Sequence, residues 1–206
     1  RPSGASSTSF FTCVRENAAT SAAMYEGTRE AGINFYDTAD QYNKGKSEEI
    51  LGGLMQGHRD ELVIATKCFN PVGDGTDVNA RGNSRRHVTR ALEASLKRLK
   101  TDRVDILFLH QIDALVPIDE QMRALEDMVR SGKVLYPAVS NWAAWQTQKA
   151  IGVQEANNWA RLQVIQPMYN LVKRQAEVEI LPMAEANGLG VIPYSPGAAG
   201  LLSGKY

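Results

Sequence analysis

Residues 104–110 read Val-Asp-Ile-Leu-Phe-Leu-His, a nearly continuous apolar run that ends abruptly in a histidine. Runs of this kind recur along the chain at intervals of one strand–helix unit. The six β-type runs are Ile33–Asp37, Leu62–Lys67, Val104–His110, Val134–Ser140, Gln163–Gln166 and Gly190–Tyr194. Because most of them are continuously apolar rather than alternating, they are typical of strands buried on both faces of a parallel sheet.

The stretches between these runs have apolar residues at the helical period. Ser84 is a suitable N-cap for one such stretch, and Gly32 and Gly132 are suitable stops for two others. Helices are therefore predicted over residues 17–31, 84–100, 119–131 and 174–187. Pro182 is expected to kink the last of them.

Regular strand–helix units with short connectors predict an α/β fold, either a (β/α)8 TIM barrel or an open doubly wound sheet. The open sheet is favoured by a GxGxxG loop after the first strand, and the chain has none. We therefore expect residues 1–206 to form a single barrel domain. Residues 70–83, rich in Gly, Asp and Asn, are predicted to form a surface loop near the site.

The composition argues against several classes of partner. The chain has 206 residues, with Lys+Arg and Asp+Glu balanced at 23 each, so we expect neither nucleic acid nor acidic lipid as a partner. No apolar run is long enough to cross a membrane. Cys13 and Cys68 form no spaced framework, which favours a reducing, cytoplasmic compartment. No spacing typical of a metal site is present.

Almost every β-type run ends in a polar residue. The strand-end residues are Asp37, Lys67, His110, Ser140-Asn141, Gln166 and Tyr194-Ser195. A single such residue is usually a helix cap or a satisfied core group, but six in register are difficult to explain in that way. Since barrel enzymes gather their chemistry at the C-terminal ends of the strands, this pattern indicates one functional mouth.

These residue types permit a carbonyl reduction. Asp37 and Lys67 would form a buried ion pair, and the ammonium would lower the pKa of Tyr42, which lies five residues after Asp37. Tyr42 could then act as a general acid, and His110 could donate a second hydrogen bond to the carbonyl oxygen. Because no side chain supplies hydride, a cofactor must do so.

The residues around this predicted site resemble the aldo-keto reductase family. Residues 32–42, Gly-Ile-Asn-Phe-Tyr-Asp-Thr-Ala-Asp-Gln-Tyr, followed by Ser-Glu-Glu-Ile-Leu-Gly at 47–52, are similar to its first signature. Val63–Lys67 resembles the strand that carries the family's lysine, and Asp105–His110 the strand that ends in its histidine. The resemblance implies that Asp37, Tyr42, Lys67 and His110 are the catalytic residues.

The resemblance also implies NADP(H) as cofactor and an aldehyde or ketone as small-molecule substrate. The positions that match the family's cofactor-binding residues are Ser140, Asn141, Gln166, Tyr194, Ser195, Pro196, Gly197, Gly200 and Lys205. Phe69 and Asn70, just beyond Lys67, are candidates for substrate contact, whereas Trp142 and Trp145 are expected to pack against the fold. The composition gives no indication of oligomeric state.

The resemblance covers about residues 17–206, and two parts of the family pattern have no counterpart. Residues 1–14 are atypical where the family has its opening hairpin and first strand, although Ser9–Val14 could form a short strand. The eighth strand, the C-terminal helices and the residues that hold the 2′-phosphate are absent. We therefore expect an incomplete barrel, since a barrel that lacks a strand cannot close.

Three functions are compatible with these residues. The first is an NADP(H)-dependent reductase of aldehydes or ketones that uses a tyrosine as general acid. The second is a redox-sensing, NADPH-binding regulatory subunit similar to potassium-channel β-subunits, and the third is a catalytically inactive, truncated barrel. Turnover against an aldehyde panel separates the first two, and NADPH binding separates both from the third.

Overall fold

A computed structural model describes residues 18–73, 75 and 77–204 of the chain. The strands within these residues are β1 (Phe35–Asp37), β2 (Val63–Cys68), β3 (Val104–Leu109), β4 (Val134–Ser140), β5 (Val164–Gln166) and β6 (Gly190–Val191). The α-helices are α1 (Ala18–Glu30), α2 (Lys46–Leu54), α3 (Arg85–Leu99), α4 (Ile118–Arg130), α5 (Ala144–Asn157) and α6 (Ile180–Ala186). The 3-10 turns are η1 (Tyr42–Gly45), η2 (Arg59–Glu61), η3 (Val78–Ala80), η4 (Gln175–Glu177) and η5 (Ala198–Ser203).

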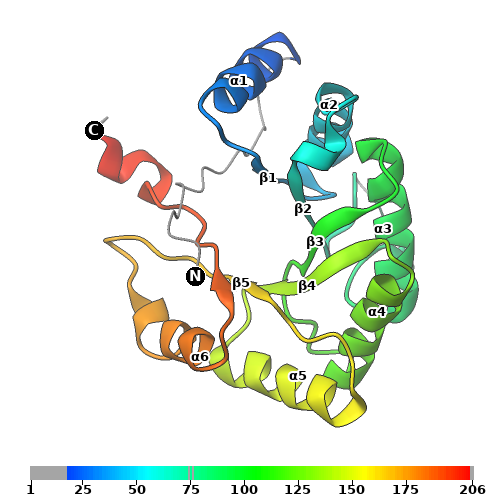
Figure 1. Cartoon of the computed structure of the whole chain (residues 1–206). Helices are drawn as coiled ribbons and strands as arrows, with labels where there is room; N and C mark the ends of the chain where they lie inside the picture. The colour runs from blue at the N-terminus through cyan, green and yellow to red at the C-terminus, as the bar shows by residue number, and fades with distance from the viewer. Residues whose placement is uncertain (1–17, 74, 76, 205–206) are drawn as a thin grey trace.

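The six strands form one parallel sheet in the order β1-β2-β3-β4-β5-β6. The sheet curves, and the helices follow one another around its convex side, as Figure 1 shows. Parallel strands in sequence order, joined by helices on one side, are the architecture of a (β/α) barrel. The described residues form an open part of such a barrel, with β1 and β6 at its two edges. The predicted α/β class and incomplete barrel are confirmed.

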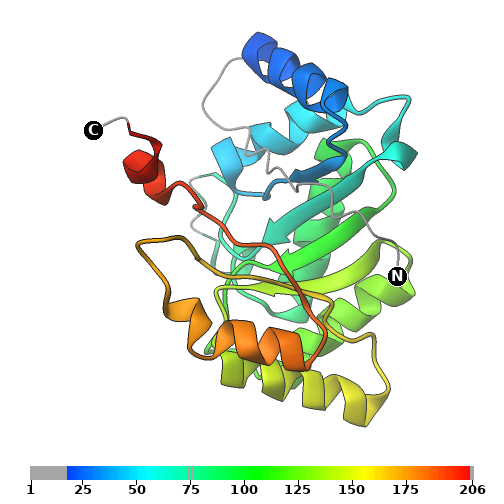
Figure 2. The ribbon, with the colours of Figure 1, turned by 60° about the vertical axis from the view of Figure 1, so that its left-hand side comes forward.

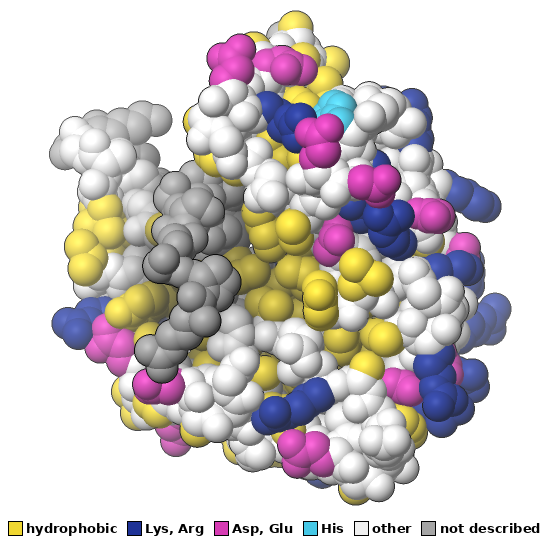
Figure 3. All heavy atoms as spheres, viewed as in Figure 1, with side chains coloured by type: hydrophobic (Ala, Val, Ile, Leu, Met, Phe, Trp, Pro, Cys, Tyr) yellow, Lys and Arg dark blue, Asp and Glu magenta, His cyan; other side chains and the backbone are white. Residues whose placement is uncertain are grey.

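Alternate side chains of each strand enter two apolar clusters. The larger cluster lies between the sheet and the helices and includes Ile64, Leu107 and Val139. The smaller cluster contains Ala65, Ile106, Phe108 and Ala138, with no helix residue among its members. Because successive strand residues point to opposite faces, the smaller cluster lies on the concave side. Figure 3 shows apolar side chains gathered in the middle of this view and charged ones toward the rim.

Helix α3 begins and ends where the sequence predicts. The Ser84 side chain accepts a hydrogen bond from the His87 amide, which caps the first turn. Its apolar stripe, which includes Val88, Leu92 and Leu99, is buried against the sheet. Gly32 and Gly132, at φ +77° and +73°, follow α1 and α4 in the left-handed conformation expected of helix stops.

Helix α2 approaches α3 so closely that only a glycine fits between them. A Cβ atom on Gly52 would lie 2.4 Å from the Arg98 carbonyl oxygen and 2.7 Å from the Leu99 Cα atom. The neighbouring Gly53 has nothing within 4 Å of the same position. Gly52 therefore sets the contact between these two helices, directly behind β1 and β2.

The prediction of one continuous helix over residues 174–187 is wrong. The segment divides into the short turn η4 and the helix α6, which begins only at Ile180. Pro182 lies in the first turn of α6, where the missing N–H is not needed, so it does not kink the helix. Val178 lies between the two pieces with 77% of its surface exposed and does not belong to a buried stripe.

The structure also differs from the sequence predictions in two helices, in the end of β6 and in one of the two tryptophans expected to pack against the fold. Helices α2 and α5 were not predicted, and β6 ends at Val191 rather than reaching Tyr194, which forms only an isolated bridge to Met168. Trp142 packs in the core as expected, whereas Trp145 is 63% exposed. The predicted strand over residues 9–14 and the atypical segment 1–14 lie outside the described residues.

Candidate active site

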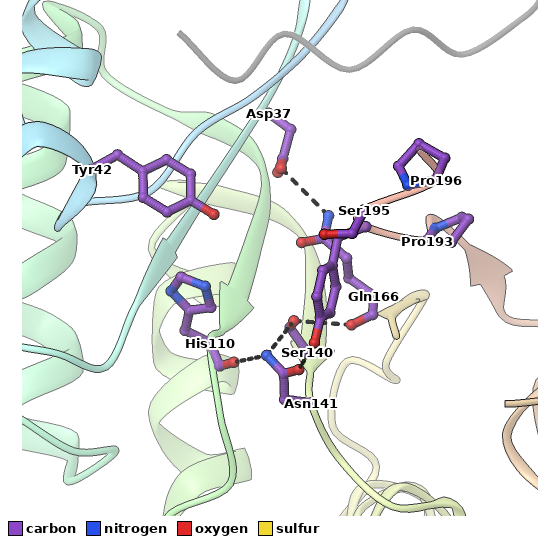
Figure 4. A pocket seen from close by; sticks show the side chains of 10 residues that line it. Asp37, Tyr42, His110, Ser140, Asn141, Gln166, Pro193, Ser195 and Pro196 are labelled. Atoms are coloured by element: carbon purple, nitrogen blue, oxygen red, sulfur yellow. Dashed lines mark hydrogen bonds between the residues drawn. The ribbon is translucent and has the colours of Figure 1, made fainter. Parts of the chain in front are cut away.

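The C-terminal ends of the strands surround a pocket of about 510 Å³. Most of the strand-end residues singled out by the sequence meet there (Figure 4). The lining residues are Asp37, Tyr42, His110, Ser140, Asn141, Gln166, Pro193, Tyr194, Ser195 and Pro196. Figure 4 shows two sides of this pocket, which we call the acid wall (Asp37, Tyr42 and His110) and the amide wall (Asn141, Gln166, Ser195 and Pro196). Tyr194, which also lines the pocket, belongs to the amide wall through its hydrogen bond to Asn141.

Asp37 and Lys67 form a buried ion pair beneath the acid wall. The Lys67 Nζ donates to Asp37 Oδ2 at 2.6 Å and to the Thr38 carbonyl oxygen at 2.8 Å, and the lysine is fully buried. Burial raises the pKa of Asp37 and lowers that of Lys67, and each partner opposes the shift of the other. Lys67 is not among the lining residues, so it acts on the pocket through Asp37 and through its charge.

Tyr42 reaches the pocket from a turn with unusual backbone geometry. Asn43, Lys44 and Gly45 follow it with φ of 48°, 54° and 88°, all in the left-handed region. This reversal directs the Tyr42 hydroxyl into the space shared with Asp37 (Figure 4). The His110 ring lies edge-on to the Tyr42 ring, with 5.9 Å between the ring centroids.

The predicted lowering of the Tyr42 pKa by Lys67 is wrong in this structure. Burial is the largest cause of a raised pKa for Tyr42, and the charge of Asp37 adds to it. The Lys67 Nζ is engaged by Asp37 and lies 5.2 Å from the centre of the Tyr42 ring instead of bonding to its hydroxyl. Tyr42 therefore keeps its proton at neutral pH and is a hydrogen-bond donor there.

His110 is neutral at physiological pH. Burial, with the charge of Lys67 as a second cause, lowers the pKa of the imidazole to about 4. Its backbone N–H donates to the Cys68 carbonyl oxygen at 3.0 Å, and its Nδ1 atom is buried without a partner among the described residues. A neutral imidazole can donate one hydrogen bond into the pocket without adding a charge.

The amide wall is built by the register of β4 and β5. Ser140 pairs with Gln166 across these strands, and its Oγ donates to the Gln166 carbonyl oxygen at 2.9 Å. Asn141 adopts φ +58°, which asparagine tolerates, and its Nδ2 donates to the His110 carbonyl oxygen at 3.0 Å. The Tyr194 hydroxyl donates to Asn141 Oδ1 at 2.8 Å. The Gln166 Nε2 has only a long bond, 3.4 Å, to Asp37 Oδ2.

Several predicted binding residues do not reach this pocket. Gly197 and Gly200 belong to the turn around η5, which projects away from the sheet in Figures 1 and 2, and Lys205 lies outside the described residues. Phe69 and Asn70 are half-buried and do not line the pocket. The loop that follows them is fastened at its other end, where the Asn83 Nδ2 donates to the Gln111 carbonyl oxygen and to Gln121 Oε1.

Sequence reasoning missed a group of buried polar residues behind the pocket. Glu48 is fully buried, accepts from Thr66 Oγ1 at 2.5 Å and pairs with Arg98 Nε at 2.7 Å. Asp40 is fully buried beside it. Both acids lie within the family signature at residues 32–52. Their position in that motif was the one signal in the sequence that could have marked them as more than surface residues. Pro193, another lining residue, was also missed.

The described part of the chain shows neither a metal-binding cluster nor a membrane-spanning helix. Within residues 18–73, 75 and 77–204, no group of three or more histidine, cysteine or acidic side chains is placed to hold a metal ion. No helix in the same part of the chain has the length and apolar character needed to span a membrane.

The parallel strands and the polar pocket at their C-terminal ends define a protein of the (β/α) barrel class. Residues 10–206 match the sequence model of the Aldo/keto reductase family. The chain therefore belongs to the aldo/keto reductase family.

Individual relatives support this assignment. The chain is 44% identical over 183 residues to the uncharacterized oxidoreductase YrpG of Bacillus subtilis. It is 38% identical over 188 residues to a probable voltage-gated potassium channel subunit beta of Oryza sativa, and 38% over 195 residues to human aflatoxin B1 aldehyde reductase member 4. These matches cover 84%, 89% and 93% of this chain and 56%, 56% and 57% of the relatives. The chain thus spans about half the length of these relatives.

Proposed function

We propose that this protein is an NADP(H)-dependent oxidoreductase that reduces aldehydes or ketones to alcohols. The observation that carries the proposal is the acid wall, where a protonated phenol and a neutral imidazole face one pocket above a buried carboxylate–ammonium pair. Membership of the aldo/keto reductase family and relatives with reductase names support the same reaction.

The amide wall fits a nicotinamide carboxamide. Such a group needs both a donor and an acceptor, and Asn141 and Gln166 each offer an amide with both. The Gln166 amide is nearly buried and holds only a 3.4 Å bond, so it can exchange that bond for a ligand. The Tyr194 ring lines the same wall and is suited to stack on the nicotinamide. A bound dinucleotide would supply the hydride, which no side chain can provide.

In the proposed mechanism the acid wall binds the carbonyl oxygen. Tyr42 and His110 donate hydrogen bonds to it, and the Tyr42 hydroxyl transfers its proton as negative charge develops on that oxygen. The Asp37–Lys67 ion pair supports these donors, since Asp37 holds the Lys67 Nζ at 5.2 Å from the centre of the Tyr42 ring. Phe69 and Asn70 remain candidates for substrate contact, at the start of the loop that Asn83 fastens.

Tyr42→Phe tests this assignment. Loss of a positioned general acid is expected to lower kcat by about 10²–10⁴-fold, with NADPH binding retained. Steady-state turnover with an aldehyde panel measures the first quantity, and quenching of tryptophan fluorescence by NADPH measures the second. Tyr169→Phe is the control, since Tyr169 bonds to Glu177 outside the pocket. Turnover of Tyr42→Phe at the wild-type rate would remove Tyr42 from the mechanism.

A second candidate function is a regulatory subunit that senses the NADPH state. It is favoured by the 38% identity to a probable voltage-gated potassium channel subunit beta. The same turnover assay separates the two functions, because typical enzymes run near about 10 per second and a sensor is expected below about one per minute. A folded sample that fails to bind NADPH would instead indicate an inactive barrel.

A further inference from the structure

Asp40 is a buried acid that the proposed mechanism does not use. Its side chain is fully buried, and neither carboxylate oxygen has a hydrogen-bond partner among the described residues. Its backbone is fixed beside the catalytic lysine, since the Asp40 N–H donates to the Lys67 carbonyl oxygen at 3.0 Å. A carboxylate so placed has lost its water and has gained only a weak interaction with the Gln41 amide, which is costly for its charged form.

The surrounding charges do not offset this cost. Three buried carboxyls, Asp37, Asp40 and Glu48, share two cations, Lys67 and Arg98. Lys67 is held by Asp37 at 2.6 Å, and Arg98 is held by Glu48 at 2.7 Å. Asp40 is therefore the one carboxyl of this cluster without a close cation.

Burial and its neighbours set the protonation of Asp40. Burial, followed by the charge of Glu48, raises the pKa of Asp40 to about 7, and the Gln41 amide, Arg98 and Lys67 lower it less. The Asp40 charge in turn adds to the raised pKa values of Cys68 and Tyr42 and opposes the lowering of the Lys67 pKa by burial. The groups that face Asp40 from the elements around it are Glu48 on α2, Arg98 on α3, Lys67 and Cys68 on β2, and Tyr42 on η1.

We propose that Asp40 holds a proton in the folded protein and is a positioning residue for the acid wall. In its neutral form it leaves Lys67 paired with Asp37 alone and adds no negative charge near the Tyr42 hydroxyl. When it ionises, the extra negative charge makes Tyr42 a weaker acid. The catalytic part of this inference rests on the proposed reductase function, whereas the protonation of Asp40 does not.

Carbon-13 NMR of the side-chain carboxyl carbons tests the protonation directly. We expect the Asp40 signal to titrate near pH 7, well above the ordinary aspartate pKa of about 3.9. Asp40→Asn should remove that signal, and the control Asp102→Asn, an acid with 84% of its side chain exposed, should leave it unchanged. Because burial also raises the pKa of Asp37, the Asp40 signal is identified by its loss in Asp40→Asn. A titration of Asp40 near pH 4, or a set of aspartate titrations that is unchanged in Asp40→Asn, would overturn the proposal.

Glu48→Gln provides a second test that does not depend on Asp40→Asn folding. Removing the Glu48 charge takes away the second cause of the shift and frees Arg98 to act on Asp40. Both changes should lower the pKa of the high-titrating aspartate, by about one unit or more. An unmoved signal would place the proton elsewhere and contradict the assignment to Asp40.

The catalytic part is read from the pH profile of kcat for reduction. Since neutral Asp40 favours proton donation by Tyr42, wild-type kcat should fall as the pH rises through about 7. Because asparagine does not ionise, Asp40→Asn should lose this fall, so that the ratio of mutant to wild-type kcat is near one well below pH 7 and rises to a higher plateau above it. If the wild type and Asp40→Asn have the same pH profile of kcat, Asp40 has no positioning role, even if the NMR titration confirms that it is protonated. Absence of turnover in every protein would instead refute the reductase function.

Discussion

The two walls of the pocket are held by the fold in different ways. The acid wall stands on β1–β3, and the Lys67 beneath it is fully buried in an ion pair. The amide wall ends on β5 and β6, which have three and two residues, and Tyr194 beyond them is held by an isolated bridge and one hydrogen bond at an exposed position. The ion pair beneath the acid wall is thus fixed by burial, whereas the groups proposed to bind the cofactor are held by an exposed bond and a long one.

This difference has a physical basis in the proposed chemistry. Proton donation to a carbonyl requires donors about 2.7–3.1 Å from the developing charge and held within about 0.5 Å of that position, which favours buried and well-packed groups. A cofactor that must enter and leave is better served by amides whose bonds can be exchanged. Asn141 and Gln166 have such bonds, to Tyr194 and Asp37 respectively.

Glycine substitutions give the largest expected contrast between the two sides. Gly52→Ala, behind the acid wall, would press a Cβ atom to 2.4 Å from the Arg98 carbonyl oxygen, so we expect it to lower the free energy of unfolding by about 3 kcal/mol or more. Gly190→Ala, in β6, would meet its nearest atom at 3.6 Å and should cost less than about 1 kcal/mol. Urea denaturation measures both values.

Gly53→Ala is the matched control for Gly52→Ala, since it lies in the same helix with nothing within 4 Å of the added atom. It should be neutral or stabilise by up to about 1 kcal/mol, because alanine has the higher helix propensity. Equal costs for Gly52→Ala and Gly190→Ala would show that the two sides are packed alike, and the comparison would fail.

The dependence of stability on pH should also come mainly from the acid wall and the residues behind it. The pKa of Asp40 is raised to about 7, so between about pH 4 and 7 the folded protein holds a proton that the unfolded chain has lost, and stability falls with rising pH. The pKa of His110 is lowered to about 4, so the unfolded chain holds the extra proton up to about pH 6.5, and stability rises. The two effects oppose each other.

Together, Asp40 and His110 should therefore change the wild-type free energy of unfolding by less than about 1 kcal/mol between pH 5 and 7. In Asp40→Asn only the His110 contribution remains. The free energy of unfolding of this variant should therefore increase by roughly 2 kcal/mol from pH 5 to pH 7. Urea denaturation at several pH values compares the two proteins. Parallel curves would mean that Asp40 ionises normally in the folded protein.

The sequence predicted the strand-end residues well because two independent signals coincide there. Strand periodicity and an abrupt polar end together placed Asp37, His110 and Gln166 at one mouth, and the structure brings them to one pocket. Their proposed roles remain predictions. The parallel sheet was predictable for a similar reason, since a short and nearly continuous apolar run such as Val104–Leu109 is typical of a strand covered on both faces.

What the sequence did not reveal depends on distances in three dimensions. Asp40 and Glu48 look like surface residues in a polar segment, yet both are fully buried, and Glu48 on α2 pairs with Arg98 on α3. The pKa of Tyr42 was predicted in the wrong direction because the effect of Lys67 depends on which atoms its ammonium contacts. Helix α2 was missed because Gly52 and Gly53 lower its helix propensity, although one of them is required for packing.

Tyr194→Phe should have the smallest effect on stability and tests the exchangeable character of the amide wall. The lost hydrogen bond to Asn141 Oδ1 is at an exposed position, so the free energy of unfolding should fall by less than about 1 kcal/mol. Because the phenyl ring can still stack and Asn141 Oδ1 is left free to accept from a carboxamide, NADPH affinity should be equal to or greater than that of the wild type. Tryptophan fluorescence titration measures this affinity, and Asn141→Ala should weaken it. A large loss of stability or of NADPH affinity in Tyr194→Phe would mean that the bond to Asn141 is a fixed part of the wall, because a contact that the cofactor displaces cannot also be needed for its binding.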